Sequence, residues 1–140
     1  IMEAGFPILL ADGNGARLTP SVVHFHEGAE PLVGASAARR RVISPADTVY
    51  SVKRFMGLRG EDLPAEETAL GYEVKRERGR AVLIHAAGRD YSPEEISAGV
   101  LRKLKTDDER ALGRRVTRAV IAVPACFYDG QRPAPELLRE

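Results

Sequence analysis

Residues 91–113 read YSPEEISAGVLRKLKTDDERALG, and this stretch contains the clearest helix signal in the chain. Ser92 and Glu95 have the spacing of a capping box, in which each side chain binds a backbone amide at the helix start. Pro93 fits the first helical position, and Gly113 is a natural stop. Between them, apolar side chains recur at helical spacing: Ile96, Val100, Leu104, Ala111 and Leu112. We predict one long helix with an apolar side.

Short β-branched and apolar segments on both sides of this helix predict strands. The expected strands are 21–25, 31–33, and a pair formed by 72–75 and 81–85 around Arg78-Gly79. Residues 1–10 fit the end of one strand, a turn at Ala4-Gly5 and a second strand. We expect another turn at Gly88-Arg89-Asp90. The nearly continuous apolar run 116–123 predicts a strand buried on both faces.

Two further helices are expected before residue 58. Ala35 to Val42 is alanine-rich and short. Ser44-Pro45-Ala46-Asp47 looks like a helix start, and a helical spacing of apolar residues follows it up to Gly57: Val49, Val52, Phe55 and Met56. Residues 58–70 look like an irregular connection. The predicted class is α/β, with mixed sheets and flanking helices.

Composition excludes several broad classes. The chain has 140 residues, of which 44% are hydrophobic and 29% charged, so it can form a folded core. With 21 basic and 20 acidic residues its net charge is +1, and no overall field favours nucleic acid or a membrane. Arg39-Arg40-Arg41 is read as a solvated helix face rather than a phosphate patch. No apolar run approaches the roughly 18 residues that cross a bilayer.

Cysteine use and the first residues suggest a compartment. Cys126 is the single cysteine, so no disulfide forms within the chain, and a reducing, cytoplasmic location is expected. Cys126 itself is read as a small buried hydrophobe. No basic segment followed by an apolar one marks a signal peptide. Because the chain opens on Ile1, we interpret it as a trimmed or processed piece.

Three patterns suggest chemistry and have simpler explanations. Residues 13–18 begin like a dinucleotide loop but end in Leu18 and precede a strand, so a plain turn is favoured. His24 and His26 face the same way on a strand, yet no third ligand is near, so exposed or edge-strand histidines are favoured over a metal site. From spacing alone, Lys53 and Arg54 are surface charges near a helix C-terminus.

Five ordered blocks resemble the ATPase domain of the Hsp70 (DnaK) chaperones. They correspond to the family patterns R-T-T-P-S-V-V, L-V-G, N-T-I-Y-S-I-K-R-F-M-G, Y-T-P-P-E-I-S and V-T-x-A-V-I-T-V-P-A. In this chain the blocks are residues 17–23, 32–34, 47–57, 91–97 and 116–125. Their order and near-family spacing extend from Ile1 to about Arg132.

The resemblance implies an actin-like, ribonuclease-H-like ATPase fold, of which this chain is part of lobe one. Residues 1–20 correspond to a remnant of the inner subdomain and 21–94 to the small outer subdomain. Residues 95–140 correspond to a helix and strand of the inner subdomain, incomplete. The family binds ATP or ADP with Mg²⁺.

The resemblance also implies roles for four residues. Lys53 matches a lysine that helps position the γ-phosphate and attacking water, which suits phosphoryl transfer. Arg54 matches an arginine near the nucleotide and the opposite lobe. Pro124 and Arg132 match members of a relay to the substrate-binding domain. No residue is predicted to bind a metal.

The parts of the family's site that this chain lacks argue against activity in this chain alone. The family's first phosphate loop precedes Ile1, while its second phosphate hairpin, adenosine pocket and second lobe follow Glu140. We therefore expect no ATP turnover by the 140 residues, because one lysine does not replace preorganised donors. The relay is also altered in sequence: Cys126, Tyr128, Gly130, Pro133 and Pro135 depart from the family pattern, and Asp108 stands on the apolar stripe of the long helix.

The expected partners are those of the family: unfolded polypeptide clients, a J-domain co-chaperone and a nucleotide-exchange factor. Exposed sheet edges also suggest dimerisation. The alternative is a naturally truncated, non-catalytic, chaperone-related binding module. A weaker third option is a nucleic-acid-binding domain that uses the arginines, which requires steeply salt-dependent binding.

Overall fold

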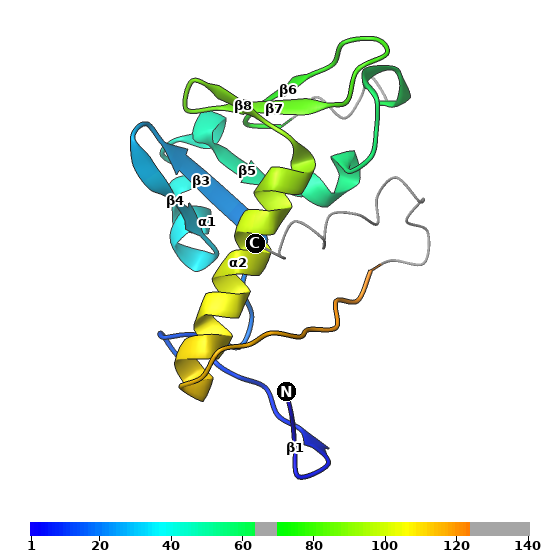
Figure 1. Ribbon diagram of the computed structural model, residues 1–140. Helices are drawn as coiled ribbons and strands as arrows, with labels where there is room; N and C mark the ends of the chain where they lie inside the picture. Colours follow the sequence, from blue (N-terminus) through cyan, green and yellow to red (C-terminus); the bar gives the residue numbers. More distant parts are fainter. Residues whose placement is uncertain (64–69, 124–140) are drawn as a thin grey trace.

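The computed structural model describes residues 1–63 and 70–123, shown in Figure 1. The strands are β1 (Met2–Glu3), β2 (Phe6–Pro7), β3 (Val22–His26), β4 (Ala29–Val33), β5 (Thr48–Tyr50), β6 (Glu73–Lys75), β7 (Leu83–Ala86) and β8 (Arg89–Tyr91). The α-helices are α1 (Ala35–Arg40) and α2 (Pro93–Leu112). Three short 3₁₀ helices are η1 (Pro45–Asp47), η2 (Val52–Phe55) and η3 (Gly60–Asp62).

Helix α2 confirms the strongest prediction from the sequence. The Ser92 hydroxyl accepts the Glu95 amide proton at 3.1 Å, and the Glu95 carboxylate accepts the Ser92 amide proton at 2.7 Å. Gly113 ends the helix with a φ of 62°, which a residue without a Cβ adopts at no steric cost. The acid buried on this helix is Asp107, which is bound by Lys103, while Asp108 is half-buried.

The remaining elements form two three-stranded antiparallel sheets, in the orders β4-β3-β5 and β6-β7-β8. In the first sheet, Val23 lies opposite Val33 on one side and Val49 on the other. In the second, Val74 lies opposite Ile84, as the predicted pairing around Arg78-Gly79 requires. The described fold is therefore a mixed α/β unit whose sheets are antiparallel.

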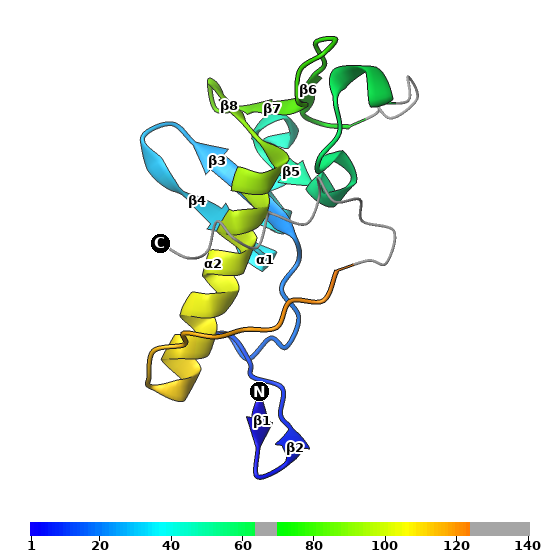
Figure 2. The ribbon, with the colours of Figure 1, turned by 45° about the vertical axis from the view of Figure 1, so that its right-hand side comes forward.

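One continuous core joins both sheets to α2, which crosses the β3–β4 hairpin in Figures 1 and 2. Phe25 of β3 stacks on Tyr91 of β8, with ring centroids 4.1 Å apart, and so links the two sheets. Buried apolar side chains from both sheets, η2, α2 and the connecting segments complete the core: Val23, Val49, Val52, Phe55, Leu63, Tyr72, Val82, Ile84, Ala86, Ile96 and Val100.

The predicted helix from Ser44 to Gly57 is wrong. A 3₁₀ turn (η1), strand β5 and a second 3₁₀ turn (η2) occupy this range. Ser44 makes no side-chain cap, and Asp47 accepts the amide proton of Ala87 at 2.7 Å instead of capping a helix. Thr48 and Val49 are β-branched, and pairing with β3 satisfies their backbone, so tertiary contacts override a spacing that resembled a helix.

Two other predictions need correction. No strand forms at 116–123 in the described part of the chain, and Val120 is fully exposed rather than buried on both faces. A strand requires a neighbour for its ladder, and no described strand pairs with this run. Arg89 and Asp90 belong to β8, so the turn preceding them is at Ala87-Gly88.

At the N-terminus, β1 and β2 form the predicted hairpin around Ala4-Gly5. It extends away from the two sheets in Figures 1 and 2. Phe6 is 72% exposed there, so the hairpin adds little to the core.

His24 is neither exposed nor on an edge strand, which corrects the sequence-based expectation. It lies on the central strand β3, is 5% exposed, and its Nδ1 is 2.9 Å from the Thr48 hydroxyl. Because that hydroxyl donates its proton to the Ser44 carbonyl at 2.6 Å, His24 Nδ1–H must be the donor to Thr48. Among the described residues, no three His, Cys, Asp or Glu side chains group as a metal site.

His24 makes the fold sensitive to acid. Burial, followed by the neighbouring His26, lowers the pKa of His24 below its usual value near 6.5. The unfolded chain then binds this proton more readily, so the stability that the neutral histidine contributes is present above pH 6.5 and decreases as pH falls below it.

We expect the urea midpoint to drop between pH 7.5 and 5.5. In His24→Asn, whose amide still donates to Thr48, this part of the pH dependence should be absent, and an unchanged pH slope would contradict the assignment.

Candidate functional site

The two cations singled out by sequence, Lys53 and Arg54, lie side by side on η2, and both side chains are exposed. The segment is one 3₁₀ turn rather than the end of an α-helix. Val52 and Phe55 flank the pair and are buried, with Phe55 only 1% exposed. The turn therefore directs apolar side chains inward and its two charges outward.

The chain reverses direction just before this turn. Ser51, between β5 and η2, has a φ of 56°, in the left-handed region that non-glycine residues rarely occupy. Such a conformation costs about 1–3 kcal/mol and persists only where surrounding contacts hold it. Here the preceding residue, Tyr50, is hydrogen-bonded through its carbonyl to the Tyr72 hydroxyl.

Tyr72 is a buried phenol with ring partners on a different segment. Its ring meets that of Tyr50 edge-on at a centroid distance of 5.3 Å, and the Arg41 guanidinium lies 3.6 Å from the Tyr50 ring centroid. Burial raises the pKa of Tyr72 well above its usual value, and the charge of Arg54 partly opposes this rise. The phenol therefore remains a hydrogen-bond donor at neutral pH.

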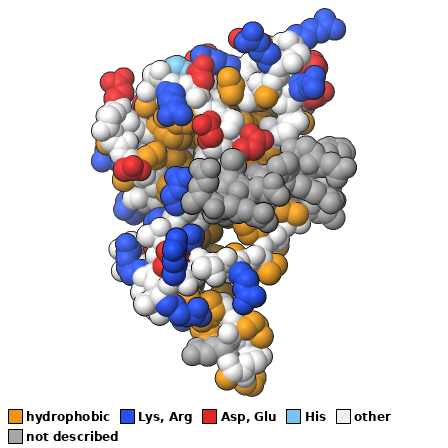
Figure 3. All heavy atoms as spheres, in the orientation of Figure 1, with side chains coloured by type: hydrophobic (Ala, Val, Ile, Leu, Met, Phe, Trp, Pro, Cys, Tyr) orange, Lys and Arg blue, Asp and Glu red, His pale blue; other side chains and the backbone are white. Residues whose placement is uncertain are grey.

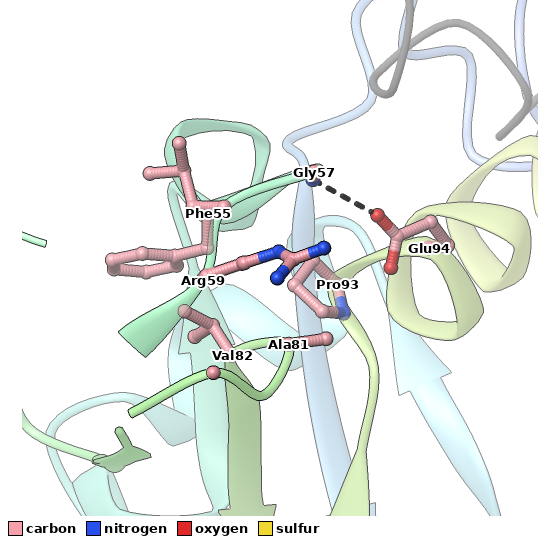
Figure 4. Close-up of a pocket in the computed structure, with 9 residues that line it drawn as sticks. Phe55, Gly57, Arg59, Ala81, Val82, Pro93 and Glu94 are labelled. Atoms are coloured by element: carbon pink, nitrogen blue, oxygen red, sulfur yellow. Dashed lines mark hydrogen bonds between the residues drawn. The ribbon is translucent and has the colours of Figure 1, made fainter. Parts of the chain in front are cut away.

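On the C-terminal side of the turn, Gly57 donates its amide proton to Glu94 Oε1 at 3.2 Å, as Figure 4 shows. Glu94 belongs to the first turn of α2, so this bond connects the end of η2 to the start of the long helix. A cavity of about 240 Å³ lies beside it, bounded by Phe55, Val82 and Pro93.

Charge on the surface is unevenly distributed. Figure 3 shows lysine and arginine side chains gathered around the C-terminal half of α2. Between 102 and 118 the basic residues are Arg102, Lys103, Lys105, Arg110, Arg114, Arg115 and Arg118, and the acidic residues are Asp107, Asp108 and Glu109. Asp107 interacts with Lys103 and Arg110. This cluster is in a different part of the chain from Lys53 and Arg54, which lie on η2.

The sequence comparison assigns the chain to a family. Residues 1–136, nearly the whole chain, match the family model described as Hsp70 protein. The chain belongs to the Hsp70 family. Among curated relatives, it is 45% identical over 134 residues to the chaperone protein dnaK1 of Synechocystis and 46% identical over 136 residues to the chaperone protein dnaK3 of Thermosynechococcus vestitus. It is 43% identical over 134 residues to the chaperone protein DnaK of Thermus thermophilus.

Each of these alignments covers 96% of this chain but only 19%, 20% and 22%, respectively, of the Hsp70 relative. The chain thus spans about a fifth of the length of the curated relatives it matches. Pro124 and Arg132, the predicted relay residues, lie outside the described residues, as do the departures at Cys126, Tyr128 and Pro133. Across residues 1–63 and 70–123, no helix has the length and apolar character needed to cross a membrane.

The sequence of this chain did not identify three residues around η2 as functional. Tyr50 was read only as part of the predicted helix 44–57, Tyr72 only as a strand residue, and Glu94 only as part of a helix start. Their contacts with η2 join positions 22 and 37 residues apart, so no local pattern signals them. The one available hint is Glu94 itself, because the family pattern Y-T-P-P-E-I-S has proline at that position.

Proposed function

We propose that this chain supplies part of lobe one of the nucleotide-binding domain of an ATP-dependent protein-folding chaperone. In this role Lys53 acts on the γ-phosphate and the attacking water, and Arg54 lies near the nucleotide. The observation that carries the proposal is the arrangement on η2, where buried Val52 and Phe55 fix the turn and Lys53 extends outward. Membership of the Hsp70 family supports the same role.

The chemistry suits a lysine. Charge stabilisation and positioning account for most of the catalysis of phosphoryl transfer, and an ammonium group provides a compact charge with three donors. The adjacent Arg54 adds a planar guanidinium that binds phosphate oxygens in pairs. Both groups fit the phosphates of ATP or ADP.

The described residues do not fit the Mg²⁺ that accompanies the nucleotide in the family. Magnesium is held through one or two carboxylates together with phosphates and water. Near η2, the Glu94 carboxylate already accepts the Gly57 amide proton. Among the described residues no three His, Cys, Asp or Glu side chains group together, so we assign none of them to the metal.

The wider assignments rest on the family. We place residues 1–20 and 95–140 in the inner subdomain and 21–94 in the outer subdomain of an actin-like ATPase fold. Pro124 and Arg132 act in the relay to the substrate-binding domain. The partners are unfolded polypeptides, a J-domain co-chaperone and a nucleotide-exchange factor, in the cytoplasm.

Dimerisation through sheet edges is also proposed, with one restriction from the structure. Strand β4 is an edge of its sheet, and its Pro31 has no amide proton to offer a second chain. The run 116–123 belongs to no sheet, but it contains no proline that would prevent pairing with a second chain.

The 140-residue chain alone is expected to release no phosphate from ATP. Lys53 stabilises one part of the transition state, and the preorganised donors and metal site that complete it are not among the described residues. A sensitive phosphate-release assay at saturating Mg-ATP tests this, with Lys53→Ala as the paired sample. Turnover that disappears in Lys53→Ala would show that the chain is catalytic by itself.

A further inference from the structure

We propose that Glu94 and Tyr72 are positioning residues that hold the Lys53 segment from its two ends. The inference rests on the proposed role of Lys53. Tyr72 binds the backbone at Tyr50, two residues before η2, and Glu94 binds the backbone at Gly57, two residues after it. Neither side chain touches the nucleotide in this scheme; each acts through the orientation of Lys53.

The N-terminal tether acts on a strained connection. Tyr72 donates its hydroxyl proton to the carbonyl of Tyr50, the last residue of β5, and Ser51 then turns through a left-handed conformation into η2. A strained residue stays in place only while its neighbours are held. Three contacts hold Tyr50 in place. It pairs with Val22 of β3, it contacts the Tyr72 ring and hydroxyl, and the Arg41 guanidinium lies over its ring.

The C-terminal tether is the bond from the Gly57 amide to Glu94 Oε1. Gly57 has a φ of 68°, so the chain again changes direction as it leaves the turn. Figure 4 shows the Glu94 carboxylate reaching from α2 to this amide beside the small cavity. Because α2 is capped and packed on the core, it offers Glu94 a fixed base.

Buried Val52 and Phe55 anchor η2 to the core, and bonds on either side of the turn further restrict the direction of its backbone. A 3₁₀ turn has weaker hydrogen-bond geometry than an α-helix and seldom persists unaided. Here the Met56 amide lies 3.4 Å from the Lys53 carbonyl, a long bond. A displacement of about 1 Å in a positioning group lowers a reaction rate by on the order of a hundredfold. The direction of η2 therefore determines whether Lys53 can act on the γ-phosphate.

The family resemblance does not already imply this tether. The family pattern Y-T-P-P-E-I-S has proline where this chain has Glu94, and proline has no side-chain acceptor for the Gly57 amide. In this chain the carboxylate in the first turn of α2 makes the bond possible.

The first test uses NMR on the full 140-residue chain. We expect Glu94→Ala to raise the amide hydrogen-exchange rate at Gly57 about tenfold, because the variant loses one hydrogen bond to that amide. The same variant should lower the backbone order parameters of Lys53 and Arg54. Glu94→Gln keeps an acceptor oxygen and should restore both. Tyr72→Phe, which keeps the ring and removes the hydroxyl, should loosen Ser51 and Lys53. Exposed Glu30→Ala is the control and should change neither. Unchanged exchange at Gly57 and unchanged order at Lys53 would overturn the proposal.

The second test separates this inference from the role of Lys53 itself. In a chimera in which this chain replaces the matching region of the Thermus thermophilus relative, we expect Glu94→Ala to lower kcat about tenfold with KM unchanged, and Glu94→Gln to restore it. If Lys53→Ala is inactive while Glu94→Ala and Tyr72→Phe keep full kcat, the positioning role is overturned and the proposed function stands. If Lys53→Ala itself keeps full kcat, the proposed function fails, whatever NMR shows at Gly57.

Discussion

Replacing Lys53 by alanine is expected to lower kcat for ATP hydrolysis about 10²–10³-fold in a chaperone that contains this chain. The physical reason is the loss of a preorganised positive charge where negative charge develops on the transferred phosphoryl group. The suitable protein is the chimera with the Thermus thermophilus relative, whose matching region is 43% identical to this chain. Single-turnover hydrolysis measures the chemical step directly.

Stability should not account for the effect, because Lys53 is exposed and its buried neighbours are untouched. We expect the free energy of unfolding of Lys53→Ala to remain within about 0.5 kcal/mol of the unchanged chain. Lys105→Ala, on α2, is the matched control for removal of a lysine. Equal rates for the Lys53 and Lys105 variants would contradict the proposed catalytic role of Lys53.

Phe55→Ala is expected to be the most destabilising substitution around η2, at about 3–5 kcal/mol. Phe55 is 1% exposed and packs in the core that joins the sheets to α2, so its loss removes apolar contacts and leaves a cavity. Against a total stability of about 5–15 kcal/mol, this loss is large. Urea unfolding followed by circular dichroism measures it.

The chain offers a control of the same residue type. Phe6 is 72% exposed on the N-terminal hairpin, so Phe6→Ala should change the free energy of unfolding by less than about 0.5 kcal/mol. Phe55→Leu, which keeps most of the volume, should cost under about 1.5 kcal/mol. Similar losses in Phe55→Ala and Phe6→Ala would mean that η2 is not anchored as the structure shows.

The contrast between α2 and residues 44–57 shows how far local signals extend. Both stretches have a serine, a following proline, an acid three residues after the serine and apolar residues at helical spacing. At α2 the acid is Glu95, which reaches back to the Ser92 amide, and twenty residues continue the helix. At Asp47 the carboxylate turns to Ala87, and β-branched Thr48 and Val49 pair with β3. The second outcome depends on β3, whose paired residues lie 24 to 28 positions earlier in the chain.

The run 116–123 shows the same limit for strands. Its composition suits a strand buried on both faces, but burial and pairing are properties of neighbours, and no described strand lies beside it. The candidate site follows the same rule. Lys53 and Arg54 were identifiable from the sequence because they are adjacent residues within a family-like block, whereas Glu94 and Tyr72 meet η2 only through the fold.

The amino-acid sequence was enough to predict the family, the long capped helix, the strand pair around Arg78-Gly79 and the adjacent cations Lys53 and Arg54. These features depend on residues close together in the chain or on an ordered set of similar blocks. Three features became clear only from the fold: residues 48–50 form a strand, His24 is buried against Thr48, and the Tyr72 and Glu94 side chains bind the backbone on either side of η2. A backbone segment adopts the conformation that satisfies its hydrogen bonds and buries its apolar groups, and for residues 44–57 the partners come from elsewhere in the fold.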